Sequence, residues 1–169
     1  LDSPHASIYL YKTKDKKLER NATLTVFNEH AAEWDLSSHS PVVSAFVNRK
    51  TQNYSPYPED EGVFESNLLA VPIIYRSKCW GALVVSHRST KYNSHDVKLI
   101  KLISLRLAIL IENAELYNEV NARRERWEAV FKFAEEGIVI FDRDGRIVGF
   151  NPAAGKLTGF SLNDVIGKK

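Results

Sequence analysis

The residue types that could catalyse a reaction or hold a metal ion are few in this chain. None of the five histidines belongs to a His-Glu-x-x-His segment, which would place two imidazoles and a general base on one helix face. The single cysteine, Cys79, can form neither a thiolate zinc site nor an internal disulfide. Gly155 and Gly159 do not form a phosphate-binding loop, because no lysine followed by Ser or Thr closes a glycine-rich turn there. We therefore predict no catalytic residues and no metal site, and the residues require no cofactor.

Composition narrows the class of protein further. The chain has 169 residues, of which 44% are apolar, and its net charge is +2, so the composition is that of a globular protein without an electrostatic signature for nucleic acid. The apolar stretch 102–111 is interrupted by Ser104 and Arg106 and is far shorter than the roughly 20 residues that cross a bilayer. One cysteine fits a reducing compartment. We expect a cytoplasmic protein whose residues contact neither nucleic acid nor membrane.

The first half of the chain alternates between apolar and polar residues, which indicates strands. Residues 6–11 and 18–27 predict a hairpin, and Ser40-Pro41 predicts the start of a short helix that ends near Lys50. Residues 51–66 predict a long loop with at most one short strand. Residues 66–75 and 80–87 predict two strands that pair antiparallel in the centre of a sheet.

From Asn93 or Ser94 the apolar period changes to about 3.6, and no proline or glycine interrupts the chain before Gly137. This predicts one long helix or two nearly continuous ones, with two apolar stripes. The first stripe consists of Leu99, Ile103, Leu107, Leu110, Ala114 and Tyr117. The second stripe consists of Leu102, Leu105, Ile109, Leu116 and Val120.

The two stripes allow two interpretations. In one, a stripe covers the sheet and the other pairs with the same helix of a second subunit, an arrangement that closes on itself. In the other, both stripes belong to one wide buried face. For the helix pair we predict contacts through Leu107, Leu110, Ala114 and Tyr117.

The pattern changes again after the helix. Residues 138–141 and 146–150 predict a hairpin around the turn signal Asp144-Gly145, and Asn151-Pro152 predicts the capped start of another helix. The chain begins with Leu-Asp-Ser-Pro, contains no methionine, and ends soon after this second sheet starts. We expect it to be a piece of a longer protein.

Residues 6 to about 117 resemble a GAF domain that lacks its first helix. The resemblance rests on the order of four segments: Ser7 to Tyr11, Ser66 to Ile73, Trp80 to Val85, and the helix Leu107 to Tyr117. Residues 127–169 resemble the start of a PAS domain. That similarity rests on Glu136 to Asp142, Asp144 to Val148, Asn151 to Ala154, Leu157 to Phe160, and Ile166 to Lys168.

The resemblance implies an α+β fold: an antiparallel six-stranded GAF sheet with packed helices, a long helix, and a PAS-type hairpin with short helices. It divides the chain into a GAF-like domain at 1–117, a signalling helix at 118–134, and the start of a PAS domain at 127–169. It also implies a homodimer formed through the long helix, with a downstream output domain.

The GAF resemblance implies that a small ligand would lie between the sheet and its connecting segments, which makes Phe46, Tyr54, Tyr57 and Phe64 candidate pocket walls. Alternatively, these rings fill space beneath a long loop. The Asn-Lys and Phe-x-x-x-Asp-Glu pattern of cyclic-nucleotide-binding GAF domains is absent. Cys79 lies in the predicted hairpin, away from the helical position where bilin-binding GAF domains attach their chromophore. The identity of any ligand or cofactor stays open.

These features lead to two function hypotheses. The first is a non-catalytic sensory region of a signal transduction protein, a sensor histidine kinase of a two-component system, which relays ligand or partner binding through a dimeric helix. The alternative is the regulatory arm of a transcription activator or cyclic-diguanylate enzyme, or an interaction scaffold without a small ligand.

Overall fold

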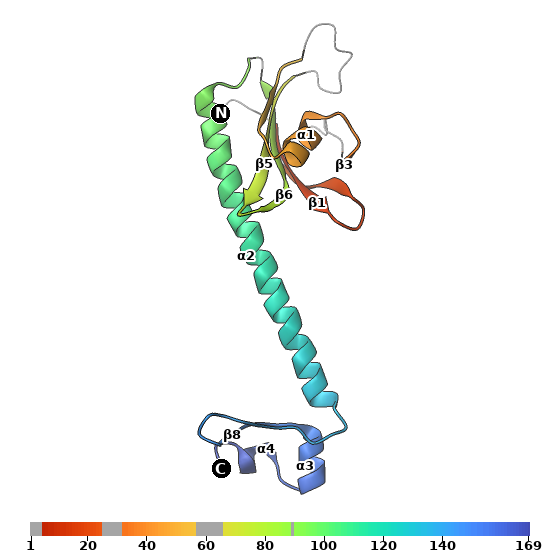
Figure 1. Ribbon diagram of the computed structural model, residues 1–169, viewed down its shortest axis with the longest axis vertical. Helices are drawn as coiled ribbons and strands as arrows, with labels where there is room; N and C mark the ends of the chain where they lie inside the picture. Colours follow the sequence, from red (N-terminus) through yellow and green to blue (C-terminus); the bar gives the residue numbers. More distant parts are fainter. Residues whose placement is uncertain (1–4, 25–31, 57–65, 89) are drawn as a thin grey trace. The chain divides into compact units, whose positions relative to one another are not determined.

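The computed structural model describes residues 5–24, 32–56, 66–88 and 90–169. The chain divides into two compact units, Leu1–Asn113 and Ala114–Lys169, and each is described here by itself. The fold is α+β, as predicted: a six-stranded antiparallel sheet with helices, one long helix, and then a β-hairpin with short helices (Figure 1).

The sheet of the first unit has the strand order β3-β2-β1-β6-β5-β4, and all of its pairs are antiparallel. Its strands are β1 (His5–Lys12), β2 (Lys17–Leu24), β3 (Glu33–Asp35), β4 (Gln52–Tyr54), β5 (Asn67–Tyr75) and β6 (Lys78–Arg88). The predicted hairpin is β1 and β2, and the predicted antiparallel pair is β5 and β6. Strand β6 is central, whereas β5 has only the three-residue strand β4 on its outer side.

A glycine allows two central strands to approach each other. In the β1–β6 pair, Gly81 lies opposite Leu10, and a Cβ atom added at Gly81 would lie 1.8 Å from the carbonyl oxygen of Tyr9. Any side chain at this position would push β1 away from β6. Gly81 is therefore required by the spacing of the sheet.

Helix α1 (Pro41–Asn48) packs on one face of the sheet. It begins as predicted: the Ser40 hydroxyl accepts hydrogen bonds from the backbone N–H groups of Val42 and Val43. It ends at Arg49, which has the left-handed backbone conformation, with φ 54°. The core on this face is formed by Tyr9, Leu18, Trp34, Val42, Val43, Ala45, Leu68, Ala70, Ala82 and Val84.

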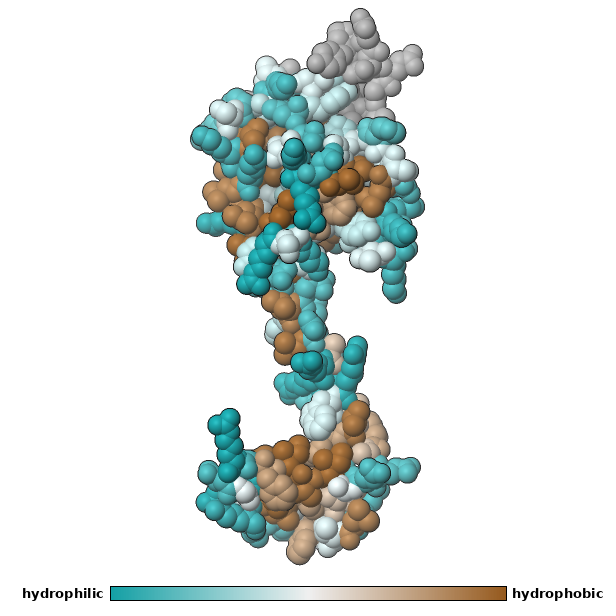
Figure 2. All heavy atoms as spheres, viewed as in Figure 1, coloured by the Kyte–Doolittle hydropathy of each residue, from teal (hydrophilic) through white to brown (hydrophobic). Residues whose placement is uncertain are grey.

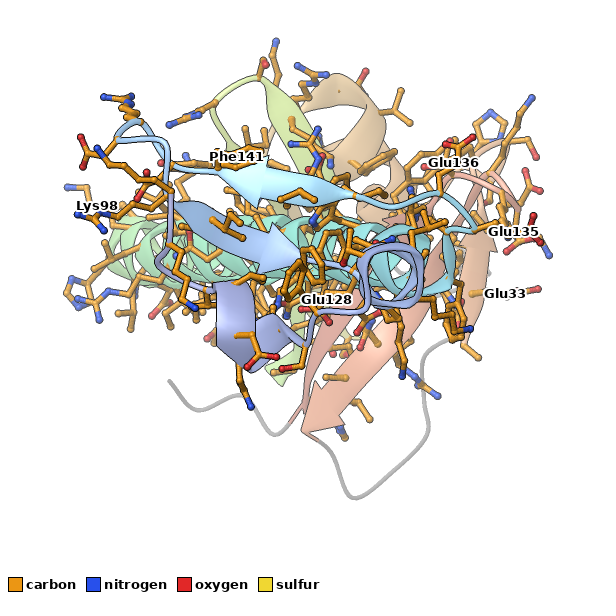
Figure 3. The ribbon with its side chains drawn as sticks, turned by 90° about the horizontal axis from the view of Figure 1, so that it is seen from below. Glu33, Lys98, Glu128, Glu135, Glu136 and Phe141 are labelled. Atoms are coloured by element: carbon orange, nitrogen blue, oxygen red, sulfur yellow. The ribbon has the colours of Figure 1, made fainter. Side chains whose placement is uncertain are left out.

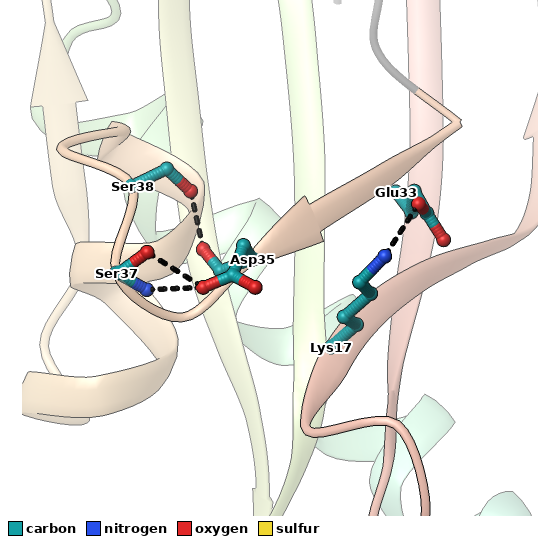
Figure 4. Close-up of polar contacts among 5 residues, drawn as sticks. All are labelled: Lys17, Glu33, Asp35, Ser37 and Ser38. Carbon is teal, nitrogen blue, oxygen red and sulfur yellow. Dashed lines mark hydrogen bonds and ion pairs between the residues drawn. The ribbon is translucent and has the colours of Figure 1, made fainter.

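The turn between β3 and α1 is held by side-chain hydrogen bonds (Figure 4). The carboxylate of Asp35 accepts from the backbone N–H of Ser37 at 2.9 Å and from its hydroxyl at 2.7 Å. The Ser38 hydroxyl donates to the main-chain carbonyl oxygen of Asp35. Lys17 of β2 pairs with Glu33 of β3 at 2.7 Å, so the edge strand is fixed at both of its ends.

Helix α2 (Ser94–Phe133) is a single continuous helix, which is the first of the two predicted alternatives. Asn93 caps it, because its side-chain oxygen accepts from the N–H groups of His95 and Asp96. The Asp96 carboxylate in turn accepts from the N–H of Asn93 at 3.0 Å, which completes a reciprocal cap. The predicted start of the helix is therefore confirmed.

The face of α2 that covers the sheet belongs to neither predicted stripe. Its buried residues are Asp96, Ile100, Ser104 and Ala108, which follow each other at intervals of four. They pack on the second core cluster, on the opposite face of the sheet from α1, which includes Leu69, Val71, Ile73, Leu83 and Val85. The prediction that a stripe covers the sheet is wrong, because small and polar residues allow α2 to approach the strands and bond to them.

The interpretation of one wide buried face is also wrong for the single chain. Leu110 and Tyr117 of the first stripe are 63% and 68% exposed, and Leu102 and Leu116 of the second stripe are 54% and 51% exposed. Only Leu107 of the first stripe packs against the sheet core. Both stripes therefore present apolar side chains that this chain itself does not cover.

The second unit contains the hairpin β7 (Val139–Phe141) and β8 (Ile147–Phe150), followed by α3 (Pro152–Thr158) and α4 (Leu162–Val165). The hairpin and the start of α3 agree with the prediction. Glu135 and Glu136 lie in the connection between α2 and β7 (Figure 3). Phe141 is the last residue of β7. Figure 2 shows hydrophobic surface on this unit, where Phe141, Leu157 and Phe160 are more than half exposed.

None of the helices in the described residues is long and apolar enough to cross a membrane.

Candidate functional site

Two of the four predicted pocket residues are brought together on the α1 face of the sheet. Phe46 of α1 and Tyr54 of β4 both pack, partly buried, against the first core cluster. Phe46 also stacks on Tyr11 of β1, with ring centroids 5.0 Å apart and planes tilted by 32°. Tyr57 and Phe64 lie outside the described residues, so their role as pocket walls stays a prediction.

The interior beneath Phe46 is occupied by the protein's own large side chains. Tyr9 is fully buried, and burial raises the pKa of its phenol, while a hydrogen bond with the Trp34 side chain and the charge of Arg20 act in the opposite direction. The Tyr9 phenol is therefore neutral at pH 7, and it belongs to the same buried core cluster as the Trp34 indole. In the described part of this face, Tyr9 and Trp34 belong to the buried core, and both interpretations of the four aromatic rings stay predictions.

The predicted dimer residues divide into two environments. Leu107 is partly buried against the sheet core, whereas Leu110, Ala114 and Tyr117 are exposed along α2. Leu110 and Tyr117 are seven residues apart, which places them on the same side of the helix. The solvent-exposed part of the first stripe therefore consists of Leu99, Ile103, Leu110, Ala114 and Tyr117.

Cys79 has the environment of a structural thiol. It is partly buried on β6, and its sulfur atom lies 3.6 Å from the carbonyl oxygen of Gly81. Burial raises the pKa of the thiol, and the positive charge of Arg49 partly offsets this effect. A thiol with a raised pKa is a poor nucleophile at neutral pH.

Sequence reasoning missed a groove beside strand β5. Its volume is about 490 Å³, and it is lined by Arg49, Lys50, Thr51, Val71, Pro72, Ile74, Lys101 and Leu105. These residues come from the end of α1, from β5 and from α2. No motif in the sequence indicates the groove, because only the packing of α2 on the sheet joins the three segments. We call it the β5 groove.

Asn151 organises the second unit. Its side-chain oxygen accepts from the N–H groups of Ile138 and Ala154, both at 2.8 Å, and its amide nitrogen donates to the carbonyl oxygen of Glu136 at 2.9 Å. Asn151 is 1% exposed, so each bond satisfies a polar group that would otherwise lack a partner. One side chain thereby joins the end of the α2 connection to β7, β8 and α3.

Among the described residues, no group of three or more His, Cys, Asp or Glu side chains is placed to hold a metal ion.

The chain thus consists of an antiparallel sheet with helices on both faces, a long helix that continues from it, and a second α+β unit. The GAF domain family matches residues 1–111, and the chain belongs to this family. The PAS fold matches residues 125–169. The chain is thus a GAF domain followed by a long helix and a PAS fragment, domains that are typical of sensory and regulatory regions.

Several solved structures share the fold of the first unit. The GAF domain of an Acinetobacter phosphoenolpyruvate-protein phosphotransferase has a TM-score of 0.59 and 19% identity, over 69% of this chain and 75% of that chain. The second GAF domain of DevS from Mycobacterium smegmatis has a TM-score of 0.58 and 11% identity, over 70% and 86% of the two chains. Residues 122 to 287 of a methyl-accepting chemotaxis protein have a TM-score of 0.57 and 20% identity, over 69% and 82%. No curated protein matches the chain.

Proposed function

We propose that this chain is the sensory and regulatory region of a sensor histidine kinase of a two-component system, and that it acts as a homodimer. The GAF domain receives a signal, either a small ligand or a partner protein. Helix α2 carries it to the PAS domain and to an output domain beyond. The combination of GAF and PAS domains supports the regulatory role.

The continuity of α2 is the observation that carries the proposal. The helix is packed on the GAF sheet through Ile100, Ser104 and Ala108, and without a break it continues into the unit that contains the PAS fragment. No other element in the described residues connects the two units. We therefore propose that a change in how the first half of α2 lies on the sheet reaches the second unit through this helix.

The exposed apolar stripes support a helix pair. Leu110 and Tyr117 leave apolar area in water that a copy of the same helix would cover, and a parallel pair brings each residue next to its own copy. A signal acts on this pair only if the ligand or partner binds one arrangement of the GAF domain more tightly than another. The first stripe is the contact that we propose.

Sedimentation velocity of the 169-residue chain tests the helix pair. We expect a dimer at micromolar concentration, and a shift to monomer in the Leu110→Asp and Tyr117→Asp variants, because a carboxylate cannot be buried unpaired in the interface. Leu116→Asp, on the second stripe, is the matched control and should remain dimeric. A monomer at high micromolar concentration, or a dimer that only Leu116→Asp disrupts, would contradict the proposal.

The kinase assignment has a separate test. The parent protein should transfer the γ-phosphate of ATP to one of its own histidines, and changes in α2 should alter the rate without abolishing ATP binding. A parent protein without autophosphorylation activity would contradict the kinase assignment while leaving the helix pair intact.

A further inference from the structure

The β5 groove lies where strand β5 extends beyond its neighbour. Strand β4 pairs with β5 only at Leu68, Leu69 and Ala70, so among the described residues the rest of β5 has no strand on its outer side. The connection after α1 and one flank of α2 close in on this stretch and form the groove. Its volume of about 490 Å³ lies in the range of small-molecule sites.

The groove concentrates positive charge. Three of its eight lining residues, Arg49, Lys50 and Lys101, are basic, and none is acidic. Within the described ranges, no carboxylate forms an ion pair with any of the three. The whole chain carries a net charge of only +2, so three cations around one groove, without an ion-pair partner among the described residues, are a local excess that attracts an anion.

The lining of the groove is more polar than apolar, and its hydrocarbon part is small. Val71, Pro72, Ile74 and Leu105 supply hydrocarbon surface. Pro72 has no N–H group, and its carbonyl oxygen already accepts a hydrogen bond from Ser104 at 2.8 Å. An extended peptide therefore cannot pair with β5 at Pro72 as an added strand. The groove therefore suits a small molecule with a polar head and only a short hydrocarbon part.

Arg49 has a backbone conformation that arginine rarely adopts. Its φ of 54° and ψ of 33° are left-handed, and at the end of a helix this conformation is usually taken by glycine or asparagine. Its N–H group donates to the carbonyl oxygen of Phe46 at 3.4 Å, which ties this conformation to the end of α1. Glycine would adopt this backbone conformation with less strain, yet the sequence has an arginine here, and its side chain lines the groove.

From these observations we propose that the β5 groove binds a small organic anion, with a carboxylate or phosphate head joined to a short hydrocarbon part. Arg49, Lys50 and Lys101 hold the head by charge-assisted hydrogen bonds, and Val71, Ile74 and Leu105 cover the hydrocarbon part. A bound anion links the end of α1 to α2. It therefore favours arrangements in which the two helices stay close.

The groove does not depend on the helix pair. On a helix with 3.6 residues per turn, Lys101 and Leu105 lie on the opposite flank of α2 from Ile103, Leu110 and Tyr117. Pairing through the first stripe therefore leaves the groove open, and a monomer retains it as well. A negative binding result and a negative dimerisation result are consequently distinguishable.

Titration with hexyl phosphate, followed by amide NMR shifts of the 169-residue chain, tests the proposal. We expect saturable shifts at Thr51, Ile74 and Leu105. Hexanoate should shift the same amides, which extends the site to carboxylates. Inorganic phosphate should bind about twofold to fivefold more weakly, because it leaves the hydrocarbon part of the lining uncovered, and neutral hexanol should give no saturable shifts at Thr51, Ile74 and Leu105. The absence of saturable binding by both hexyl phosphate and hexanoate would overturn the proposal.

Charge variants locate the site. Arg49→Gly and Lys101→Gln should each weaken hexyl phosphate binding about threefold to tenfold. Arg49→Gly relieves the left-handed backbone, so loss of binding in a chain of equal or higher stability excludes misfolding. Lys14→Gln is the matched control, because Lys14 lies in the exposed turn between β1 and β2. Equal affinity in all three variants would show that the anion binds elsewhere and would overturn the assignment.

Discussion

The Ser104 hydroxyl of α2 donates a 2.8 Å hydrogen bond to the carbonyl oxygen of Pro72 in β5. Ser104 is 2% exposed, and this bond fixes the position of the helix along the sheet. It also occupies the acceptor of a residue that has no N–H to offer, on the outer side of β5. The same contact thus anchors α2 and prevents β5 from pairing with another strand at Pro72.

Removal of this hydroxyl should weaken the first unit. Ser104→Ala leaves the Pro72 carbonyl oxygen without its protein partner, so we expect the free energy of unfolding to fall by about 1–3 kcal/mol. Urea denaturation measures the change. Ser77→Ala, in the exposed turn between β5 and β6, is the control and should change it by less than about 0.5 kcal/mol. Equal effects of the two substitutions would argue against the anchoring role.

The three hydrogen bonds of Asn151 predict a graded response in the second unit. Asn151→Ala loses all three, and we expect the amides of Ile138 and Ala154 to lose most of their protection from hydrogen exchange. Asn151→Asp keeps an acceptor for both N–H groups, but it buries a charge and places an oxygen against the Glu136 carbonyl oxygen, so protection should be lost at neutral pH and partly recovered at low pH, where the carboxyl group is protonated. If Asn151→Ala retained the protection of the unchanged chain, the organising role of Asn151 would be wrong.

The environment of Cys79 predicts slow alkylation. Burial raises the pKa of the thiol, and an acid with a raised pKa remains protonated as the pH rises through the ordinary range of cysteine. The midpoint of a rate–pH profile with iodoacetamide should therefore lie above about 8.5. Arg49→Gly should move the midpoint higher still, because it removes the opposing positive charge. A midpoint at or below that of an unstructured cysteine would contradict the burial of the thiol.

The turn at Asp35 predicts that the stability of the fold falls at acidic pH, because the pKa of Asp35 is lowered, whereas that of Cys79 is raised. The hydroxyl and N–H of Ser37 lower the pKa of the Asp35 carboxyl in the folded chain. A carboxylate whose pKa is lowered stabilises the fold at pH values above its unfolded pKa of about 3.9, and this stabilisation is lost as the pH falls through the folded pKa.

Carboxyl NMR titration tests the origin of this shift. Ser37→Ala should raise the pKa of Asp35, because it removes the largest cause of the shift. Ser38→Ala should leave the pKa nearly unchanged, because the Ser38 hydroxyl bonds to the main-chain carbonyl and not to the carboxylate (Figure 4). A larger effect of Ser38→Ala would contradict this assignment.

Local signals in the sequence were sufficient for the elements of the fold. The Ser40 cap, the Asn151-Pro152 start of α3 and the uninterrupted α2 were predicted, because caps, proline and helix-breaking residues act on their immediate neighbours. The sheet-covering face of α2 was not predicted. The polar residue Ser104 lies on this face because its hydroxyl bonds to the Pro72 carbonyl oxygen, and this contact forms only when the helix packs on the sheet.

The candidate sites were predictable to different degrees. The apolar pattern of Leu110 and Tyr117 could be recognised from the sequence, since a regular pattern on a helix is a local property, whereas their pairing with a second subunit stays a prediction. The β5 groove could not be found in this way. Lys101 lies about fifty positions after Arg49 and Lys50, and only the tertiary fold brings these residues next to Pro72 and Ile74.

Cysteine cross-linking along α2 tests the central claim, a parallel helix pair through the first stripe, most directly. In a Cys79→Ser background, we compare single substitutions Leu110→Cys, Tyr117→Cys and Glu115→Cys under mild oxidation. In a parallel pair, each first-stripe cysteine lies close to its own copy, within the few ångströms that a disulfide requires. We predict cross-linked dimers for Leu110→Cys and Tyr117→Cys and none for Glu115→Cys, which lies on another side of the helix. No cross-linking at either first-stripe position, or equal cross-linking at Glu115→Cys, would contradict the claim.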